Sequence, residues 1–306
     1  MKLKLLILLS MILFISAACT IPGGGGQGKA ENNVIGINFV TNLPPQELSE
    51  GQSFRVGLNV KNYDTSKKDV LICTWDELGD VFDGIPENSC TSVKLEAAEL
   101  SGENILPTDQ KVYFPDKESF YSYKKLTDNM KTAVFADVSY NHKTRGVAQI
   151  CIKKDIDTET PGVTCDATSD EEISNNAGPI QISNLKKMVY PVSGGKVIIQ
   201  LKFDVSNVGS GKVINKNAVK SKEDIEPLIN LNVNLLGLTN SFKCNPTKDN
   251  KIPFKENQKT IKCESTINLE QDYIVHPVEI TIDYSYNTMI STSSISLLKI
   301  EGGTKK

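Results

Sequence analysis

The chain has 306 residues, of which 39% are hydrophobic and 23% are charged, and this composition excludes a disordered protein. The length suits one large domain or two ordinary ones. Basic residues number 34 against 37 acidic ones, and apart from Arg55 and Arg145 they are all lysines. Because arginine makes the bidentate contacts to phosphate and guanine, this balance argues against a nucleic-acid-binding protein.

The first 18 residues have the pattern of a secretory signal peptide. Lys2 and Lys4 give a positive start, and residues 5–15 are apolar except for Ser10. A helix of about eleven residues rises only about 16 Å, roughly half of a bilayer core. The segment therefore predicts export of the chain and removal of residues 1–18, rather than a membrane span.

Cys19 has two interpretations. The small residues just before it satisfy an ordinary signal peptidase. Alternatively, Ser16-Ala17-Ala18-Cys19 resembles the lipobox of prokaryotic lipoproteins, although that family prefers a bulky apolar residue where Ser16 stands. Glycines dominate residues 23–28, which is typical of a flexible tether. The resemblance implies a lipid on Cys19, an anchor on the outer face of the cell membrane, and a tether that extends to residue 33.

Six cysteines remain after Cys19, and an even set in an exported chain predicts disulfides. Sequence alone leaves 15 connectivities open. The consecutive pairs would each close a loop of about 15 to 20 residues, worth on the order of 3 kcal/mol in the chain-entropy model; these suggested pairs are Cys73–Cys90, Cys151–Cys165 and Cys244–Cys263. Zinc is the rival interpretation, but the chain has no C-x-x-C pair and only two histidines.

Two segments recur at almost one offset, which predicts a duplicated domain. Residues 137–141 (DVSYN) recur 146 positions later as 283–287 (DYSYN). Residues 58–62 (LNVKN) recur 145 positions later as 203–207 (FDVSN). The chain is therefore predicted to contain two copies of one domain.

Period-2 alternation along these segments predicts strands. Asn141 and Asn287 are turn-type residues, so each copy is expected to end in a hairpin whose second strand follows the asparagine. In the second copy this strand would contain Ile295 and Leu297. No amphipathic helix of ordinary length is evident, and the best short candidate covers residues 221–228.

Short strands separated by turn residues, over about 120 to 140 residues per copy, predict antiparallel β-sandwiches. Residues 205–211 (VSNVGSG) resemble the V-x-N-x-G strand and turn of CARDB-like domains, immunoglobulin-like sandwiches of prokaryotic and especially archaeal surface proteins. The first copy has a degraded form, with Asp64 at the glycine position. The predicted fold is all-β, with two tandem sandwiches at 34–168 and 180–300, a linker at 169–179 and a disordered tail at 301–306.

Catalytic motifs are absent: the chain has no H-E-x-x-H, G-x-S-x-G or P-loop pattern. His142 lies in a polar stretch and is interpreted as an exposed turn residue. His276 precedes a proline and a strand and is interpreted as structural. No cofactor is predicted. Carboxylate pairs of the glycosidase kind stay open, because sequence distance does not report their spacing.

Asp155, Asp157 and Glu159 form the best metal candidate, because alternating carboxylates suit calcium. The spacing does not match an EF-hand, and a solvated loop is the favoured interpretation.

Aromatic residues cluster in the first copy and could form a binding platform, although a core role is favoured; the residues are Trp75, Tyr113, Phe114, Tyr121 and Tyr123. Trp75 is expected to share a strand face with Cys73.

Two classes of function follow. The favoured one is a non-catalytic, lipid-anchored cell-surface protein whose sandwiches bind a surface protein or a glycan, in adhesion or as an envelope scaffold. The alternative is an exported enzyme or enzyme accessory that uses carboxylate chemistry, for example on a glycan. Two facing carboxylates in an open cleft would favour the alternative.

Overall fold

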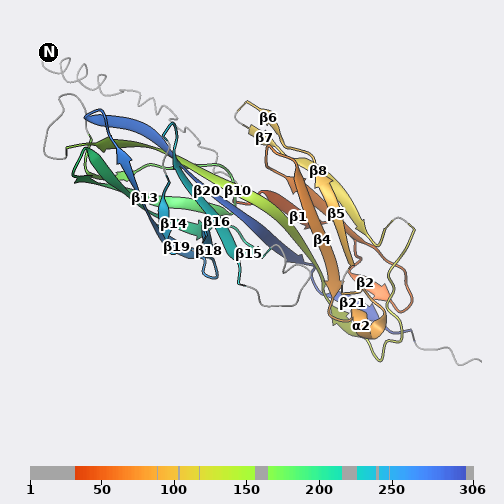
Figure 1. The fold of residues 1–306 in the computed structure, drawn as a ribbon. Coiled ribbons are helices and arrows are strands. Elements are labelled where there is room, and N and C mark those ends of the chain that lie inside the picture. The colour runs from red at the N-terminus through yellow and green to blue at the C-terminus, as the bar shows by residue number, and fades with distance from the viewer. Residues whose placement is uncertain are drawn as a thin grey trace, which may run out of the picture.

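The computed structural model describes residues 32–300, apart from 88, 103, 117, 156–164, 216–225, 239, 240 and 248. The signal peptide, Cys19, the glycine tether and the tail lie outside these residues. As predicted, the described chain is all-β, with its sheets stacked in two lobes (Figure 1) and one short helix, α2 (Gly79–Phe82). Within the part of the chain that the structure describes, no helix is long and apolar enough to cross a membrane.

The first lobe packs a three-stranded sheet against one half of an eight-stranded sheet. The smaller sheet has the order β1-β3-β8, and the larger one contributes β5, β4 and the first part of β10. Alternate residues of each strand point into the space between the sheets, so Leu58 and Val60 are buried while Asn59 faces outward. The bounds are β1 (Ile35–Phe39), β3 (Val56–Asn62), β4 (Lys68–Asp76), β5 (Ser89–Leu95), β8 (Thr108–Phe114) and β10 (Val134–Lys153).

The second lobe packs a five-stranded sheet, β11-β13-β14-β19-β17, against the other half of the eight-stranded sheet. There β18, β16 and β20 join the second part of β10. Two short strands, β12 and β15, pair with β10 and β20. The bounds are β11 (Thr168–Glu171), β12 (Ser174–Asn175), β13 (Ile180–Val192), β14 (Lys196–Asn207), β15 (Lys212–Ile214), β16 (Leu228–Leu235), β17 (Lys243–Asn245), β18 (Lys251–Pro253), β19 (Gln258–Asn268) and β20 (Tyr273–Ser291).

β10 and β20 pair with each other through both lobes (Figure 1). The predicted hairpins at Asn141 and Asn287 are therefore wrong, because both residues lie inside long strands. Both asparagines have a cross-strand serine as partner: Ser285 donates to Asn141 (2.7 Å) and Asn287 donates to Ser139 (2.9 Å). A turn-type residue on a strand surface is tolerated when its side chain is hydrogen-bonded in this way.

The order of strand pairing in the first lobe recurs in the second. β1-β3-β8 corresponds to β13-β14-β19, with Ile35 opposite Asn62 in one lobe and Ile180 opposite Asn207 in the other. Each of these asparagines accepts a hydrogen bond from the backbone N–H two residues on and donates one to the carbonyl four residues on. Tyr140 and Tyr286, which are 146 residues apart, are direct cross-strand partners. These equivalences support the predicted duplication, whereas the domain boundaries stay a prediction.

The two lobes differ in the strand that pairs with the long strand, β10 in the first lobe and β20 in the second. β4 lies beside β10 without interruption, but its counterpart beside β20 is divided into β15 and β16. The predicted helix at 221–228 falls in this insertion: residues 221–225 lie outside the described residues, and Leu228 begins β16.

The end of the chain returns to the first lobe. β21 (Ile295–Leu298) pairs in parallel with β2 (Glu47–Ser49) and antiparallel with β9 (Met130–Thr132). Ile295, Leu297 and Leu48 are almost fully buried. Ile295 and Leu297 are predicted from the sequence to continue a hairpin of the second copy, but they complete the core of the first lobe instead.

Candidate functional site

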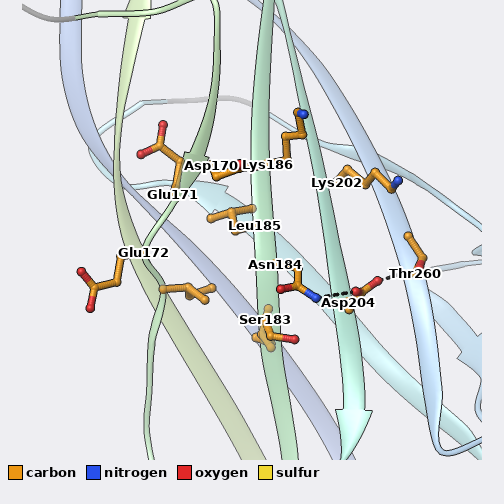
Figure 2. Close-up of a pocket in the computed structure, with 12 residues that line it drawn as sticks. Asp170, Glu171, Glu172, Ser183, Asn184, Leu185, Lys186, Lys202, Asp204 and Thr260 are labelled. Carbon is orange, nitrogen blue, oxygen red and sulfur yellow. Dashed lines mark hydrogen bonds between the residues drawn. The ribbon is translucent and has the colours of Figure 1, made fainter.

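An open groove lies where the chain crosses from one sheet to the other. β11 pairs with β13 in the five-stranded sheet, whereas β12 pairs with β10 in the eight-stranded sheet. We call the groove beside this crossing the crossover groove; its volume is about 770 Å³ (Figure 2). Its lining residues are Asp170, Glu171, Glu172, Ile173, Ile182, Ser183, Asn184, Leu185, Lys186, Lys202, Asp204 and Thr260.

Two consecutive asparagines hold this crossing in place. The Asn175 amide donates to the carbonyl of Ile182 (2.8 Å) and accepts from its N–H (3.1 Å). The Asn176 amide donates to the carbonyl of Lys143 (3.0 Å) and accepts from the N–H of Arg145 (2.7 Å). The Asn175 side chain therefore caps the open edge of β13, and the Asn176 side chain caps the open edge of β10. Both side chains satisfy backbone groups that no adjacent strand reaches.

Asn175→Ala is expected to lower the free energy of unfolding by about 1–3 kcal/mol, because both backbone groups of the buried Ile182 lose their partner. Urea unfolding of the full chain measures this. Asn230→Ala is the control, since Asn230 is exposed on β16 and its removal should change stability by less than about 0.5 kcal/mol. Equal losses in the two variants would rule out the capping role.

A bulge in β13 places the most strongly hydrogen-bonded carboxylate of the crossover groove. The pairing of β13 with β14 shifts register between Ser183 and Lys186, and Asn184 has φ of 53°. Asn184 and Thr260 donate to Asp204 at 2.9 and 2.6 Å. These two hydrogen bonds lower the pKa of Asp204, so its carboxylate acts as a charged acceptor rather than as a general acid.

Glu171 and Glu172 do not face Asp204 across the crossover groove (Figure 2). In Figure 2 the side chains of Glu171 and Glu172 point away from Asp204, which lies on the other side of β13. The paired arrangement that glycosidic hydrolysis needs is therefore not seen at this groove.

A second cluster lies at the junction of the two lobes, and we call Asp64, Lys68 and His142 the junction cluster. Lys68 Nζ lies 2.7 Å from Asp64 Oδ2, and His142 Nδ1 lies 3.3 Å from the same oxygen. His142 Nε2 lies 2.9 Å from the carbonyl of Ala177, so this nitrogen carries the proton. Nδ1 then accepts from Lys68 (3.2 Å) when the ring is neutral and donates to Asp64 when the ring is protonated.

The junction cluster is largely buried, which decides its electrostatics. Burial alone raises the pKa of Asp64, but the hydrogen bonds from His142 and Lys68, with the charge of Lys68, outweigh it and leave the pKa well below its usual range. The expectation that His142 is an exposed turn residue is wrong, since its side chain is only 2% exposed. It points inward because it belongs to the alternating pattern of β10, in phase with Tyr140 and Thr144.

A second groove, of about 660 Å³, lies at the same junction. Lys143 and Asp283 form an ion pair across it at 3.3 Å, and the exposed asparagines 141 and 230 also line it. The groove therefore offers charged and neutral hydrogen-bonding groups, and Lys68 and His142 of the junction cluster also line it.

His276 has a structural partner, in keeping with its interpretation. Its Nδ1 lies 3.0 Å from the carbonyl of Leu236, which leads out of β16.

All six cysteines in the described residues form disulfides, and the pairs are the three that the spacing suggested. Two of them join directly opposed residues of adjacent strands: Cys73 with Cys90, and Cys244 with Cys263.

The sequence prediction missed a buried lysine beside the Cys151–Cys165 disulfide. Lys187 is 1% exposed and donates to the carbonyls of Cys151 (2.7 Å) and Asp166 (2.8 Å), with Glu171 at 3.6 Å. Burial lowers its pKa, and Glu171 opposes that shift. The signal was present in the sequence, because Lys187 is in phase with the buried Leu185 and Val189.

The calcium candidate is only partly described. Asp155 has an interaction partner, and Asp157 and Glu159 lie outside the described residues. Across the ranges that the structure covers, no group of three or more His, Cys, Asp or Glu side chains is suited to a metal ion.

Most of the predicted binding aromatics belong to the core. Phe114, Tyr121 and Tyr123 are buried, so they cannot form a surface platform. Trp75 lies on the same face of β4 as Cys73, as predicted, and stacks on Phe135 with ring centroids 5.6 Å apart. Tyr113 is 39% exposed and lies under the guanidinium of Arg55.

Taken together, the fold and the disulfides define an all-β protein of the sandwich class, cross-linked as proteins of oxidising compartments are. No protein-family model matches the chain, and no curated protein matches it.

Among solved structures, Escherichia coli alpha-2-macroglobulin activated by porcine elastase is similar at 9% identity and a TM-score of 0.19, over 89% of this chain and 22% of that one. The secreted serine protease VesC from Vibrio cholerae is similar at 10% identity and a TM-score of 0.16, over 87% of this chain and 52% of that one. The chain thus spans about a fifth and about half of these two proteins, and scores this low carry no inference about function.

Proposed function

We propose that this protein is a non-catalytic, lipid-anchored cell-surface protein that binds another surface molecule or serves as an envelope scaffold. The observation that carries the proposal is the pairing of β10 with β20 through both lobes. A ladder that belongs to two sandwiches at once fixes their relative orientation, which suits a protein that presents surfaces rather than one that closes on a substrate.

The chemistry of the grooves supports the same proposal. Asp204 is held charged, both histidines have structural backbone partners, and the cysteines are cross-linked. In the described chain these groups stabilise the fold through hydrogen bonds and disulfides. The three disulfides fit an exported location, and the Ser16-Ala17-Ala18-Cys19 pattern supplies the anchor.

Cys19→Ser tests the anchor. In a prokaryotic host that lipidates exported proteins, the unsubstituted chain is expected in the carbonate-washed membrane fraction, with an intact mass that begins at Cys19 and includes added lipid. The variant is expected to lose both properties because it lacks the thiol that carries the lipid. Release of both proteins by the wash, each without added lipid mass, would contradict the proposal.

A further inference from the structure

The hairpin β6 (Glu99–Ser101) and β7 (Asn104–Leu106) is the most exposed apolar part of the first lobe. It forms a two-stranded sheet of its own, at the end of the lobe beyond β5 and β8 (Figure 1). Leu100, Ile105 and Leu106 are 67%, 42% and 51% exposed. Single exposed apolar residues are ordinary, but three on one short hairpin indicate a contact surface.

Two of these side chains share one face of the hairpin. Leu100 is directly opposite Ile105, whereas Leu106 is opposite Glu99 on the other face. Since cross-strand partners point to the same side, Leu100 and Ile105 can touch a flat surface together. We call this pair the hairpin face.

The described chain begins at the junction of the lobes, close to the base of this hairpin. The Asn33 side chain lies against Gly209 of the second lobe, and Ile35 then pairs with Asn62. Asn62 pairs in turn with Thr108, two residues after β7. Ile35 and the hairpin base are therefore two strand spacings apart, about 10 Å.

The length of chain before this point limits how far the junction can lie from the lipid. Residues 20–31 separate Cys19 from Asn32. Their greatest span is about 43 Å, and a glycine-rich chain of this length has a root-mean-square span of about 20 Å. The hairpin base is thus held within reach of the membrane to which the proposed function attaches Cys19.

From these observations we propose that the hairpin face contacts the lipid surface as a second, apolar attachment beside the lipid on Cys19. The proposal rests on the anchored location proposed above. Leu100 and Ile105 enter the interfacial region, where exposed apolar side chains leave water. The hairpin then sets which side of the protein faces the membrane.

Charges at the hairpin base make this contact apolar rather than electrostatic. Lys67 pairs with Glu96 at 2.7 Å, and the lysines of β3 and β5 nearest the hairpin, 61 and 94, have Asp109 and Asp69 as cross-strand partners. The hairpin strands add the exposed Glu99 and no basic residue, so the contact is expected to be no stronger on anionic than on zwitterionic lipid.

Tryptophan quenching tests the contact in the intact protein. Leu100→Trp and Val81→Trp are a matched pair, because the two native residues are 67% and 68% exposed and Val81 lies in α2 at the far end of the lobe (Figure 1). The full membrane-extracted protein is reconstituted into phosphatidylcholine vesicles with or without acyl-chain-brominated phosphatidylcholine. Trp75 contributes the same background to both variants.

L100W is expected to be quenched at least about twofold more than V81W, and no more strongly when about 30% of the lipid is phosphatidylglycerol. Equal quenching of L100W and V81W would overturn the hairpin contact, provided that both proteins float with the vesicles. If neither protein floats with the vesicles, the anchor fails and the hairpin contact fails with it. Flotation therefore distinguishes failure of the lipid anchor from failure of the hairpin contact alone.

Discussion

Leu297→Ala is expected to lower the free energy of unfolding by about 2–5 kcal/mol, the range for truncating a fully buried leucine. Leu297 is 0% exposed and lies in β21, the strand between β2 and β9. Loss of its side chain leaves a cavity in the first lobe, although the residue is close to the end of the described chain. Urea unfolding followed by circular dichroism measures the change.

Ile300→Ala is the matched control for this variant. Ile300 is three residues further on and is 58% exposed, so its truncation should change the free energy of unfolding by less than about 0.5 kcal/mol. If both variants were equally mild, β21 would not contribute to the core as the structure places it.

Asp64→Asn is expected to lower the free energy of unfolding by about 2–3 kcal/mol at pH 7. The substitution removes the charge that Lys68 and His142 share while keeping the shape of the side chain. The estimate lies below the range of about 3–5 kcal/mol for breaking a fully buried ion pair, because Asp64 is 17% exposed and an amide oxygen still accepts one hydrogen bond.

The pH dependence of this effect has a definite sign. The folded-state pKa of Asp64 lies below its unfolded value, so its carboxylate stabilises the fold at pH values above about 4. That contribution is lost as the pH falls further, toward the folded pKa. The stability difference between the native chain and D64N should therefore shrink as the pH falls below about 4.

Unfolding of both proteins by urea across this pH range measures the difference. Asp109→Asn is the control, because Asp109 is exposed on β8 and its charge should contribute less than about 1 kcal/mol. A difference that did not shrink below about pH 4 would exclude the assigned role of Asp64.

The fold class follows from local pattern, which is why the sequence predicts it well. Period-2 burial along β10 and β14 is set by each residue and its near neighbours, and it holds across both strands. The disulfides follow because each closes a short loop, with separations of 14 to 19 residues. The recurring Asn62 and Asn207 mark equivalent turns for the same reason, since each bonds its own neighbours.

Features that depend on distant residues could not be predicted in this way. Asn141 has the chemistry of a turn residue, but it lies inside a continuously paired strand, where Ser285 across the sheet donates to its side chain. The burial of His142 depends on Asp64 and on the carbonyl of Ala177. The destination of β21 depends on a vacant position between β2 and β9, which no property of residues 295–298 indicates.

The position of β21 has a consequence for when the protein can fold. β21 pairs with β2, about 250 positions earlier in the chain, so the first lobe cannot be completed until β21 has been synthesised. Pairing over such a distance forms slowly, and until then the apolar side of β2 and β9 is uncovered and prone to aggregation. The first lobe is therefore synthesised first but completed last, whereas each of the three short disulfide loops can close under oxidising conditions as soon as its own two cysteines have been synthesised.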